Sequence, residues 1–309
     1  MNSDPTRLDS LWSPNRQASK LSEAIVRFIF GAFALVSVAT TAGIVATLVF
    51  ETFEFFQQVP IWNFLTDTKW TPLFKSAQFG IFVLISATLL TSTIAVTVAL
   101  PLGLFAAICL SEYATPRTRQ IIKPLLEVLA GIPSVVFGYF ALLFVTPLLQ
   151  TFMPNLQGFN ALSAGLVLGI SITPLIASLS EDAIYAVPRS LRDGSYALGA
   201  TKRETIVSVV LPAALSGIVS SVILAVSRAI GETMIVTLAA GQNPTLGLNP
   251  FVPIMTMTAF IVQVSLGDTP AGSLAFQTIF AVGMTLFLLT LVLNVFSFWF
   301  VRRFREKYD

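Results

Sequence analysis

The 309-residue chain is 55% hydrophobic and 11% charged, with a formal net charge of +2 and a mean hydropathy of +0.81. Because an average soluble domain is about 25% charged, this composition excludes a soluble globule and predicts an all-α, polytopic membrane protein. The chain has no histidine and one cysteine, Cys109. This excludes an internal disulfide, a site with several Cys or His metal ligands, and Ser-His or Cys-His catalysis.

The N-terminal segment, residues 1–27, is predicted to be a cytoplasmic tail that leads into a first span at residues 28–50. This apolar run is longer than a signal-peptide core and has no clear small-x-small exit, so we expect it to remain as a helix. Residues 51–77 contain two prolines and two tryptophans, which favour an outer segment at the membrane interface.

The remaining spans are predicted within a permease core at residues 78–301. The second span, 78–110, is interrupted by Pro101 and is expected to be tilted or kinked. Residues 128–180 carry no charge and are long enough for two spans, which the polar break at 151–160 divides. The fifth and sixth spans are expected at 213–240 and 276–301. The apolar stretch 251–266 is too short to cross and predicts a re-entrant or interfacial helix.

The basic residues predict the orientation of the chain in the membrane. Fifteen of the 18 Lys and Arg residues lie in the N-terminal tail, the second-to-third loop, the fourth-to-fifth loop and the tail at 302–309. Two, Lys69 and Lys75, lie on the other side. By the positive-inside rule, both termini and the loop at 181–212 are expected on the cytoplasmic side, giving six spans with N- and C-termini inside.

The loop at 189–212 reads RSLRDGSYALGATKRETIVSVVLP. Ser190 predicts a helix start, and Gly199 predicts its end because glycine enters the left-handed conformation freely. Thr201 and Glu204 predict a capping box that opens a second helix leading into the fifth span. An ordinary structured loop is the alternative interpretation of these features.

This loop resembles the E-A-A-x-x-L-G-A…I-x-L-P coupling loop of ABC importer permeases, although Asp193 replaces the usual glutamate and Gly194 and Ser195 replace two alanines. The resemblance implies the type I ABC importer permease fold. It also implies that an ATPase subunit contacts the loop, at Asp193, Ser195, Ala197, Leu198, Gly199, Ala200 and Thr201.

Three further stretches resemble phosphate permeases of the PstC type: Ser111 to Phe140, the segment SRAIGETMIV at Ser227 to Val236, and Thr256 to Pro270. The resemblance implies a subunit of a phosphate importer in the bacterial plasma (inner) membrane. Its partners would be a similar permease of the PstA type, two PstB-type ATPases and a PstS-type phosphate-binding protein. No nucleic-acid partner is expected. Because this chain lacks G-x-x-x-x-G-K-[ST], we expect ATP and Mg²⁺ on the ATPases, no cofactor or metal here, and no enzymatic activity.

Two charges interrupt the apolar fifth span. Arg228 and Glu232 are four residues apart, and on a continuous helix they would share a face turned toward the bundle interior, near Ser227 and Thr233. The guanidinium fork matches phosphate oxygens. The carboxylate can accept the O–H of hydrogen phosphate and repel anions that lack one. These four residues are therefore the predicted substrate pathway.

Other interpretations of this chain remain open. Arg228 and Glu232 could form a structural ion pair that locks the bundle. The substrate could be another oxyanion, such as molybdate or sulfate. An ion-coupled transporter working alone is a further alternative, although no inverted repeat is evident.

Overall fold

The computed structural model describes residues 16–74 and 76–304. The described residues fall into two units, one within residues 1–50 and the other within residues 51–309. The first unit contains the beginning of helix α2 (Arg16–Gln58), and the second contains the end of α2 and everything that follows. The outermost parts of the predicted tails, residues 1–15 and 305–309, lie outside the described residues.

Six helical segments of the described chain are long and apolar enough to cross a membrane, as predicted. The first lies in α2, and the last in α14 (Leu274–Phe304). The others are α4 (Phe82–Ile108) with the π-helical turn η1 (Cys109–Tyr113); α6 (Ser134–Phe140), η2 (Ala141–Val145) and α7 (Thr146–Phe152); α8 (Ala161–Tyr185); and α10 (Lys202–Thr205), η3 (Ile206–Val210) and α11 (Leu211–Ile230).

Several boundaries differ from those predicted. Helix α2 extends the expected first span in both directions, so parts of the predicted tail and outer segment are helical. The fifth span ends at Ile230 instead of near residue 240, and a short helix, α12 (Met234–Ala239), follows the break. The short apolar helix predicted within 251–266 is present as α13 (Met257–Leu266).

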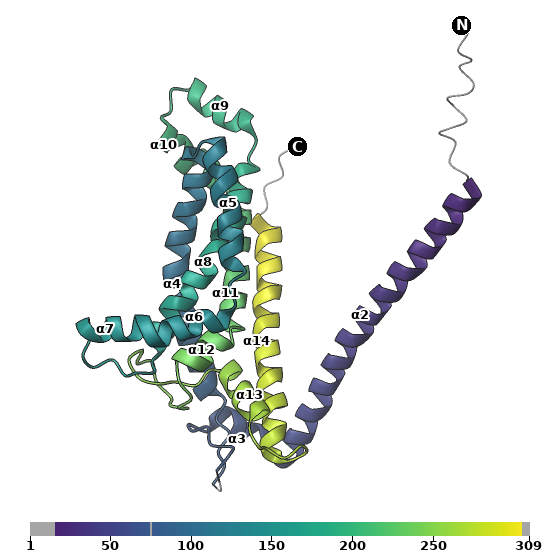
Figure 1. The fold of residues 1–309 in the computed structure, drawn as a ribbon, viewed down its shortest axis with the longest axis vertical. Coiled ribbons are helices and arrows are strands. Elements are labelled where there is room, and N and C mark those ends of the chain that lie inside the picture. Colours follow the sequence, from purple (N-terminus) through teal and green to yellow (C-terminus); the bar gives the residue numbers. More distant parts are fainter. Residues whose placement is uncertain (1–15, 75, 305–309) are drawn as a thin grey trace. The chain divides into compact units, whose positions relative to one another are not determined.

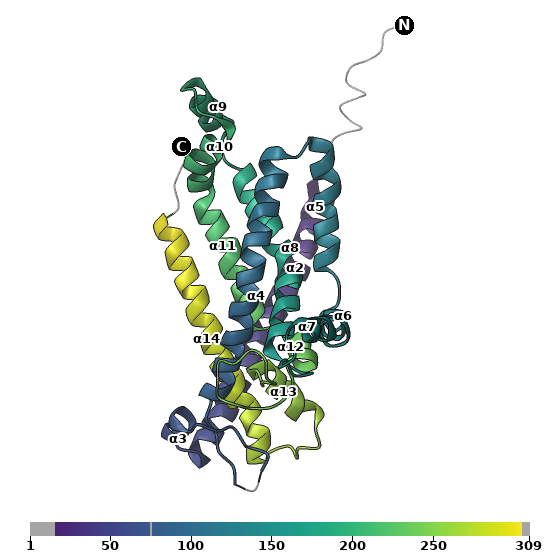
Figure 2. The same cartoon turned by 90° about the vertical axis from the view of Figure 1, so that its left-hand side faces the viewer.

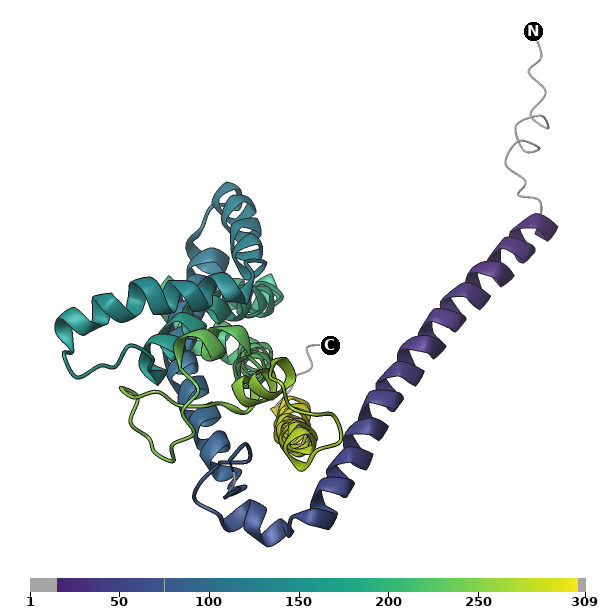
Figure 3. The ribbon, with the colours of Figure 1, turned by 60° about the horizontal axis from the view of Figure 1, so that its bottom comes forward.

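The third predicted span differs in direction from its neighbours. Helix α5 (Pro116–Ala130) packs along α8. Helices α6 and α7 then run across α4 and α8 instead of alongside them (Figures 1, 2 and 3). Apolar composition predicts that a segment belongs in a membrane, but the direction of the segment depends on packing.

The second unit has two distinct ends. Helices α9 (Arg189–Ala197) and α10 lie at one end, which we call the α9 end, and the C-terminal end of α14 points toward it (Figures 1 and 2). Helices α3 (Ile61–Thr66) and α13 lie at the opposite end, which we call the α13 end (Figure 2).

The core is built on close contact between α4 and α8, the most extensively packed pair of helices. A Cβ atom added at Gly165 would lie 2.7 Å from Ile94, and one at Gly169 would lie 2.7 Å from the carbonyl oxygen of Ala95. Such small residues let two helix backbones approach closely within a membrane. Helix α11 packs against both α8 and α4, which positions the segment that carries Arg228.

At the α13 end, the loops are held by a cluster of aromatic side chains. Trp70 is 1% exposed and makes an edge-to-face contact with Phe260 of α13, with 5.0 Å between ring centroids. Phe55, Phe64 and Phe79 extend the cluster in similar geometry. The predicted outer segment therefore forms part of a packed structure that holds α13 in place.

Candidate functional site

Arg228 lies in the last turn of α11, on a face that the described residues leave open. Its side chain is exposed, and Leu224, one turn earlier, is 50% exposed. Ala225 and Ala229, on another face of the same helix, are buried in the core. The guanidinium is therefore not sealed inside this chain.

Glu232 lies just beyond the end of α11, where the chain is not helical from Gly231 to Thr233. Its Oε1 atom accepts hydrogen bonds from the N–H groups of Met234, at 3.1 Å, and Ile235, at 3.3 Å. These are among the first N–H groups of α12, which have no partner within the helix. The carboxylate of Glu232 therefore caps α12.

The predicted shared helix face of Arg228 and Glu232 is wrong, because the helix ends between them at Gly231. Among the described residues, the ion pairs of the chain do not include one between these two side chains. Each charge instead lies at a helix end of favourable sign, the cation at the C-terminus of α11 and the anion at the N-terminus of α12. A structural ion pair locking the bundle is therefore not what the structure contains.

The other two predicted pathway residues support the same break. Ser227 donates a hydrogen bond to the side-chain oxygen of Asn294 on α14, at 3.3 Å. Thr233 donates to the carbonyl oxygen of Gly231, also at 3.3 Å. In addition, the hydroxyl of Thr258 on α13 donates to the main-chain oxygen of Glu232, at 2.7 Å. Six polar side chains from three parts of the chain thus lie around the end of α11: Ser227, Arg228, Glu232 and Thr233, together with Thr258 of α13 and Asn294 of α14.

The predicted coupling loop has the local geometry expected of it, with one correction. Helix α9 begins at Arg189 after Pro188, one residue before the predicted start at Ser190. Gly199 has a φ of +87°, and Thr201 and Glu204 form the predicted capping box at the start of α10. The helix–glycine–helix prediction is confirmed.

The predicted ATPase-contact residues form a largely open surface at the α9 end. Leu198 is 90% exposed. Asp193, Ala197, Gly199 and Thr201 are also exposed, whereas Ser195 and Ala200 are half-buried. The Ser195 hydroxyl lies 2.9 Å from that of Thr205 and so fixes α9 against the start of the span.

An ion-pair cluster near the α9 end joins α5 to α8. Glu181 has a fully buried side chain and lies 2.6 Å from Arg119 and 2.9 Å from Lys123. Lys123 also pairs with Asp182, and the Arg119 guanidinium stacks 3.6 Å from the centroid of the Tyr185 ring. Partial burial lowers the pKa of Arg119 and of Lys123, but hydrogen bonds and charge from the acidic partners outweigh it, so both pKa values are raised.

Comparison with protein-family models identifies the fold family. Residues 99–306 match the model described as "Binding-protein-dependent transport system inner membrane component". The chain belongs to this family. The predicted resemblance to ABC importer permeases is thereby confirmed.

Individual relatives of this inner membrane component are similar over most of its length. The chain is 34% identical over 289 residues to the probable ABC transporter permease protein YqgH of Bacillus subtilis, covering 93% of this chain and 91% of that protein. It is 32% identical over 294 residues to the phosphate transport system permease protein PstC of Haemophilus influenzae, covering 89% and 91%. The PstC of Mesorhizobium japonicum is 33% identical over 260 residues, with 78% of each chain covered.

Solved structures support the fold of this family member. An alginate ABC transporter chain aligns with a TM-score of 0.64 at 15% identity, covering 94% of this chain and all of that one. A chain of the MetNI methionine ABC transporter aligns with a TM-score of 0.53 at 18% identity, covering 74% and 95%. These identities are too low to carry substrate information.

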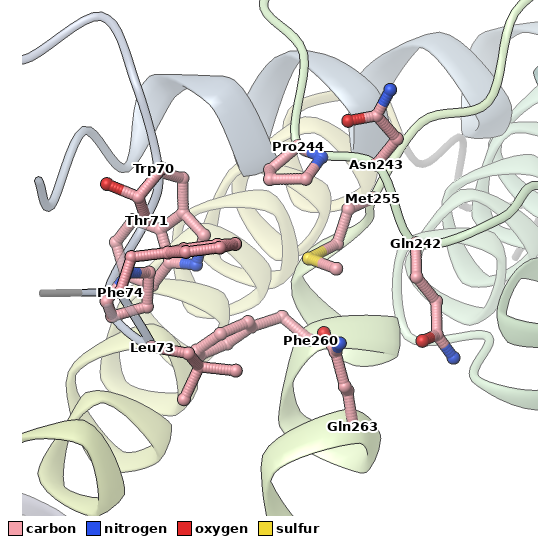
Figure 4. A pocket seen from close by; sticks show the side chains of 11 residues that line it. Trp70, Thr71, Leu73, Phe74, Gln242, Asn243, Pro244, Met255, Phe260 and Gln263 are labelled. Carbon is pink, nitrogen blue, oxygen red and sulfur yellow. The ribbon is translucent and has the colours of Figure 1, made fainter. Parts of the chain in front are cut away.

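A pocket of about 250 Å³ opens at the α13 end of this inner membrane component, away from the coupling loop. Figure 4 shows the Trp70 and Phe74 side chains on one side and Gln242 and Asn243 on the other. None of the described residues that line it is charged. The described lining therefore offers amide and hydroxyl groups instead of charged groups. Among the described residues, no three His, Cys, Asp or Glu side chains are grouped so that they could hold a metal ion.

Sequence reasoning missed several polar residues around these sites. Thr258 and Asn294 are far along the chain from Arg228, and their contacts depend on how α13 and α14 pack. Glu112, Glu181 and Arg192 could have been noticed as charges bordering apolar spans, which are costly to bury without partners. Their partners could not have been assigned without the fold.

Proposed function

We propose that this chain is the permease subunit of an ATP-driven importer of inorganic phosphate. The single observation that carries the proposal is the open guanidinium of Arg228 at the end of a membrane span. It occurs in a chain similar to proteins named PstC over most of its length. An arginine within a membrane is costly unless it meets water or protein. The open face of α11 therefore lines the translocation path together with a second permease.

The proposed assembly comprises a PstA-type permease, two PstB-type ATPases and a PstS-type phosphate-binding protein. ATP and Mg²⁺ bind to the ATPases, and this chain hydrolyses nothing. The exposed coupling loop, with Leu198 projecting from it, supports docking of an ATPase at the α9 end. In this arrangement, closure of the ATPases moves the loop and the spans as rigid bodies.

The α9 end is proposed to face the cytoplasm of a bacterial cell and the α13 end to face outward. Basic residues of the described chain at the start of α5, in α9 and α10 and at the end of α14 support this orientation. The binding protein would then deliver phosphate at the α13 end.

Arg228 is proposed to bind phosphate oxygens transiently, with Ser227 and Thr233 beside it. Glu232 uses Oε1 to cap α12, so its other oxygen is the one proposed to accept the O–H of hydrogen phosphate. A carboxylate near an anion-binding site also weakens binding, which suits a transient site that must release its substrate.

Reconstitution of the complex in proteoliposomes tests the proposal. We expect ATP to drive accumulation of ³²P-phosphate when the binding protein is present. Excess unlabelled phosphate should compete, and sulfate and molybdate should not. Competition by sulfate or molybdate at least as strong as by phosphate would reassign the substrate to another oxyanion. Uptake without any ATPase would support an ion-coupled transporter instead.

A further inference from the structure

Arg192 makes more polar contacts with other segments than any other residue of the predicted coupling loop. Its Nη2 atom donates to Glu112 Oε1 at 2.7 Å, and Nε donates to the same oxygen at 3.3 Å. Nη2 also donates to the carbonyl oxygen of Ile184 at 2.9 Å, and Nη1 donates to that of Val187. One guanidinium therefore joins α9 to two other segments.

These two segments are the ends of the most tightly packed pair of helices. Glu112 belongs to η1, the π-helical continuation of α4. Ile184 lies in the last turn of α8 and Val187 lies just beyond it, where carbonyl groups lack partners within the helix. Arg192 thus donates hydrogen bonds both to a carbonyl oxygen at the end of α8 and to a carboxylate at the end of α4.

The contact is well shielded from solvent. The side chains of Arg192 and Glu112 are 15% and 7% exposed. At such a site the planar guanidinium can donate in several fixed directions, which a lysine ammonium on a flexible stem does not reproduce. Removing one partner would leave the other charge poorly compensated.

Apolar packing alone holds α9 weakly. No residue of α9 is fully buried, and Leu191 is partly buried against the neighbouring cluster. Apart from Arg192, the Ser195–Thr205 contact connects α9 to the start of the next span. The position of α9 relative to α4 and α8 therefore depends on the Arg192 contacts.

We infer that Arg192 is a positioning residue that transmits movement of the coupling loop to α4 and α8 together. The inference rests on the proposed function, because an ATPase must move the loop. A shift of α9 acts on both helix ends through one rigid side chain, so the α4–α8 pair moves as a unit. Without Arg192, the loop can follow the ATPase while the spans lag behind.

The test is the amount of phosphate transported per ATP hydrolysed by the reconstituted complex. In Arg192→Gln, we expect this ratio to fall about tenfold while ATP hydrolysis by the assembled complex persists. Two milder variants keep the test usable if Arg192→Gln does not assemble. Arg192→Lys keeps the charge but loses the fork, and Glu112→Gln keeps an acceptor. Both should lower the ratio less than Arg192→Gln.

Arg117→Gln is the matched control, because Arg117 is an exposed arginine near the same end, outside the loop. Its ratio should equal that of the wild type. If Arg192→Gln assembles, an unchanged ratio would overturn the inference, even if uptake and hydrolysis both fall. If Arg192→Gln does not assemble, an unchanged ratio in both Arg192→Lys and Glu112→Gln would overturn it. If the phosphate assignment is wrong, the wild-type complex will transport another oxyanion instead. The ratio of transport to ATP hydrolysis would then be measured with that anion. If no ATPase binds the wild type, both proposals fail.

Discussion

The hydroxyl of Thr258 donates a 2.7 Å hydrogen bond to the main-chain carbonyl oxygen of Glu232. Thr258 is 5% exposed, so its hydroxyl has little access to water as an alternative partner. This bond connects α13 to the break between α11 and α12. The position of Glu232 is therefore determined partly by a helix that begins 25 residues further along the chain.

Thr258→Val should destabilise this break. Valine has a similar shape but no donor, so the carbonyl oxygen of Glu232 is left unpaired, at a cost of about 1–3 kcal/mol. We expect a lower thermal unfolding midpoint and reduced phosphate uptake. Thr41→Val is the control, because Thr41 is exposed and its hydroxyl bonds locally to Ser37. Equal behaviour of the two variants would contradict the role of Thr258.

Arg228→Gln should abolish most phosphate uptake without preventing assembly. Hydrogen bonds to a charged group are worth about 1.5–3 kcal/mol, so loss of the guanidinium should reduce uptake by at least about tenfold. Arg228→Lys should be intermediate because it keeps the charge without the fork. The measurement is ATP-driven uptake normalised to the amount of complex. Normal uptake by fully assembled Arg228→Gln would end the proposal.

Glu232→Gln separates the charge of this side chain from its capping role. The amide oxygen can still accept from the N–H groups of Met234 and Ile235, so α12 should remain capped. Loss of the negative charge should impair phosphate transport and relax discrimination against sulfate, which has no O–H to donate at neutral pH. Competition by sulfate during uptake measures this change. Unchanged selectivity would refute the proposed acceptor role.

Gly199→Ala should strain the coupling loop. The φ of +87° at this residue is unfavourable for a side chain bearing a Cβ, by about 1 kcal/mol or more. There is open space around the site, so the effect should come from backbone strain alone. We expect a lower unfolding midpoint and weaker copurification of the ATPase. Gly194→Ala is the matched control for stability, since Gly194 lies in α9 with open space around it and ordinary φ, and alanine there should raise the midpoint.

The contribution of Lys123 to stability should persist through neutral pH. Its pKa is raised in the folded chain above the usual 10.5, so its ion pairs with Glu181 and Asp182 contribute fully below that value. The contribution is lost as pH rises through the folded pKa. The difference in unfolding midpoint between wild type and Lys123→Gln should therefore be constant from about pH 7 to 9 and shrink as the pH rises beyond 10.5. A difference that disappeared by pH 8 would contradict this assignment.

The sequence by itself determined the features that depend on neighbouring residues. Six apolar segments follow from the energetic cost of placing polar groups in a membrane. The turn at Gly199 and the capping box of Thr201 and Glu204 follow from local backbone preference and hydrogen bonds three residues apart. The position of the coupling loop, by contrast, follows from its resemblance to the E-A-A-x-x-L-G-A…I-x-L-P motif of ABC importer permeases.

Only the tertiary structure decided the features that depend on distant segments. The apolar run around Arg228 predicts one continuous helix to about residue 240, and yet the helix ends at Ile230. The carboxylate of Glu232 and the hydroxyl of Thr258 stabilise the break there. The direction of α6 and α7 and the contact of Arg192 with Glu112 likewise depend on packing. Hydropathy records the cost of exposing a residue to lipid or water, but it does not record which distant group will satisfy a buried charge.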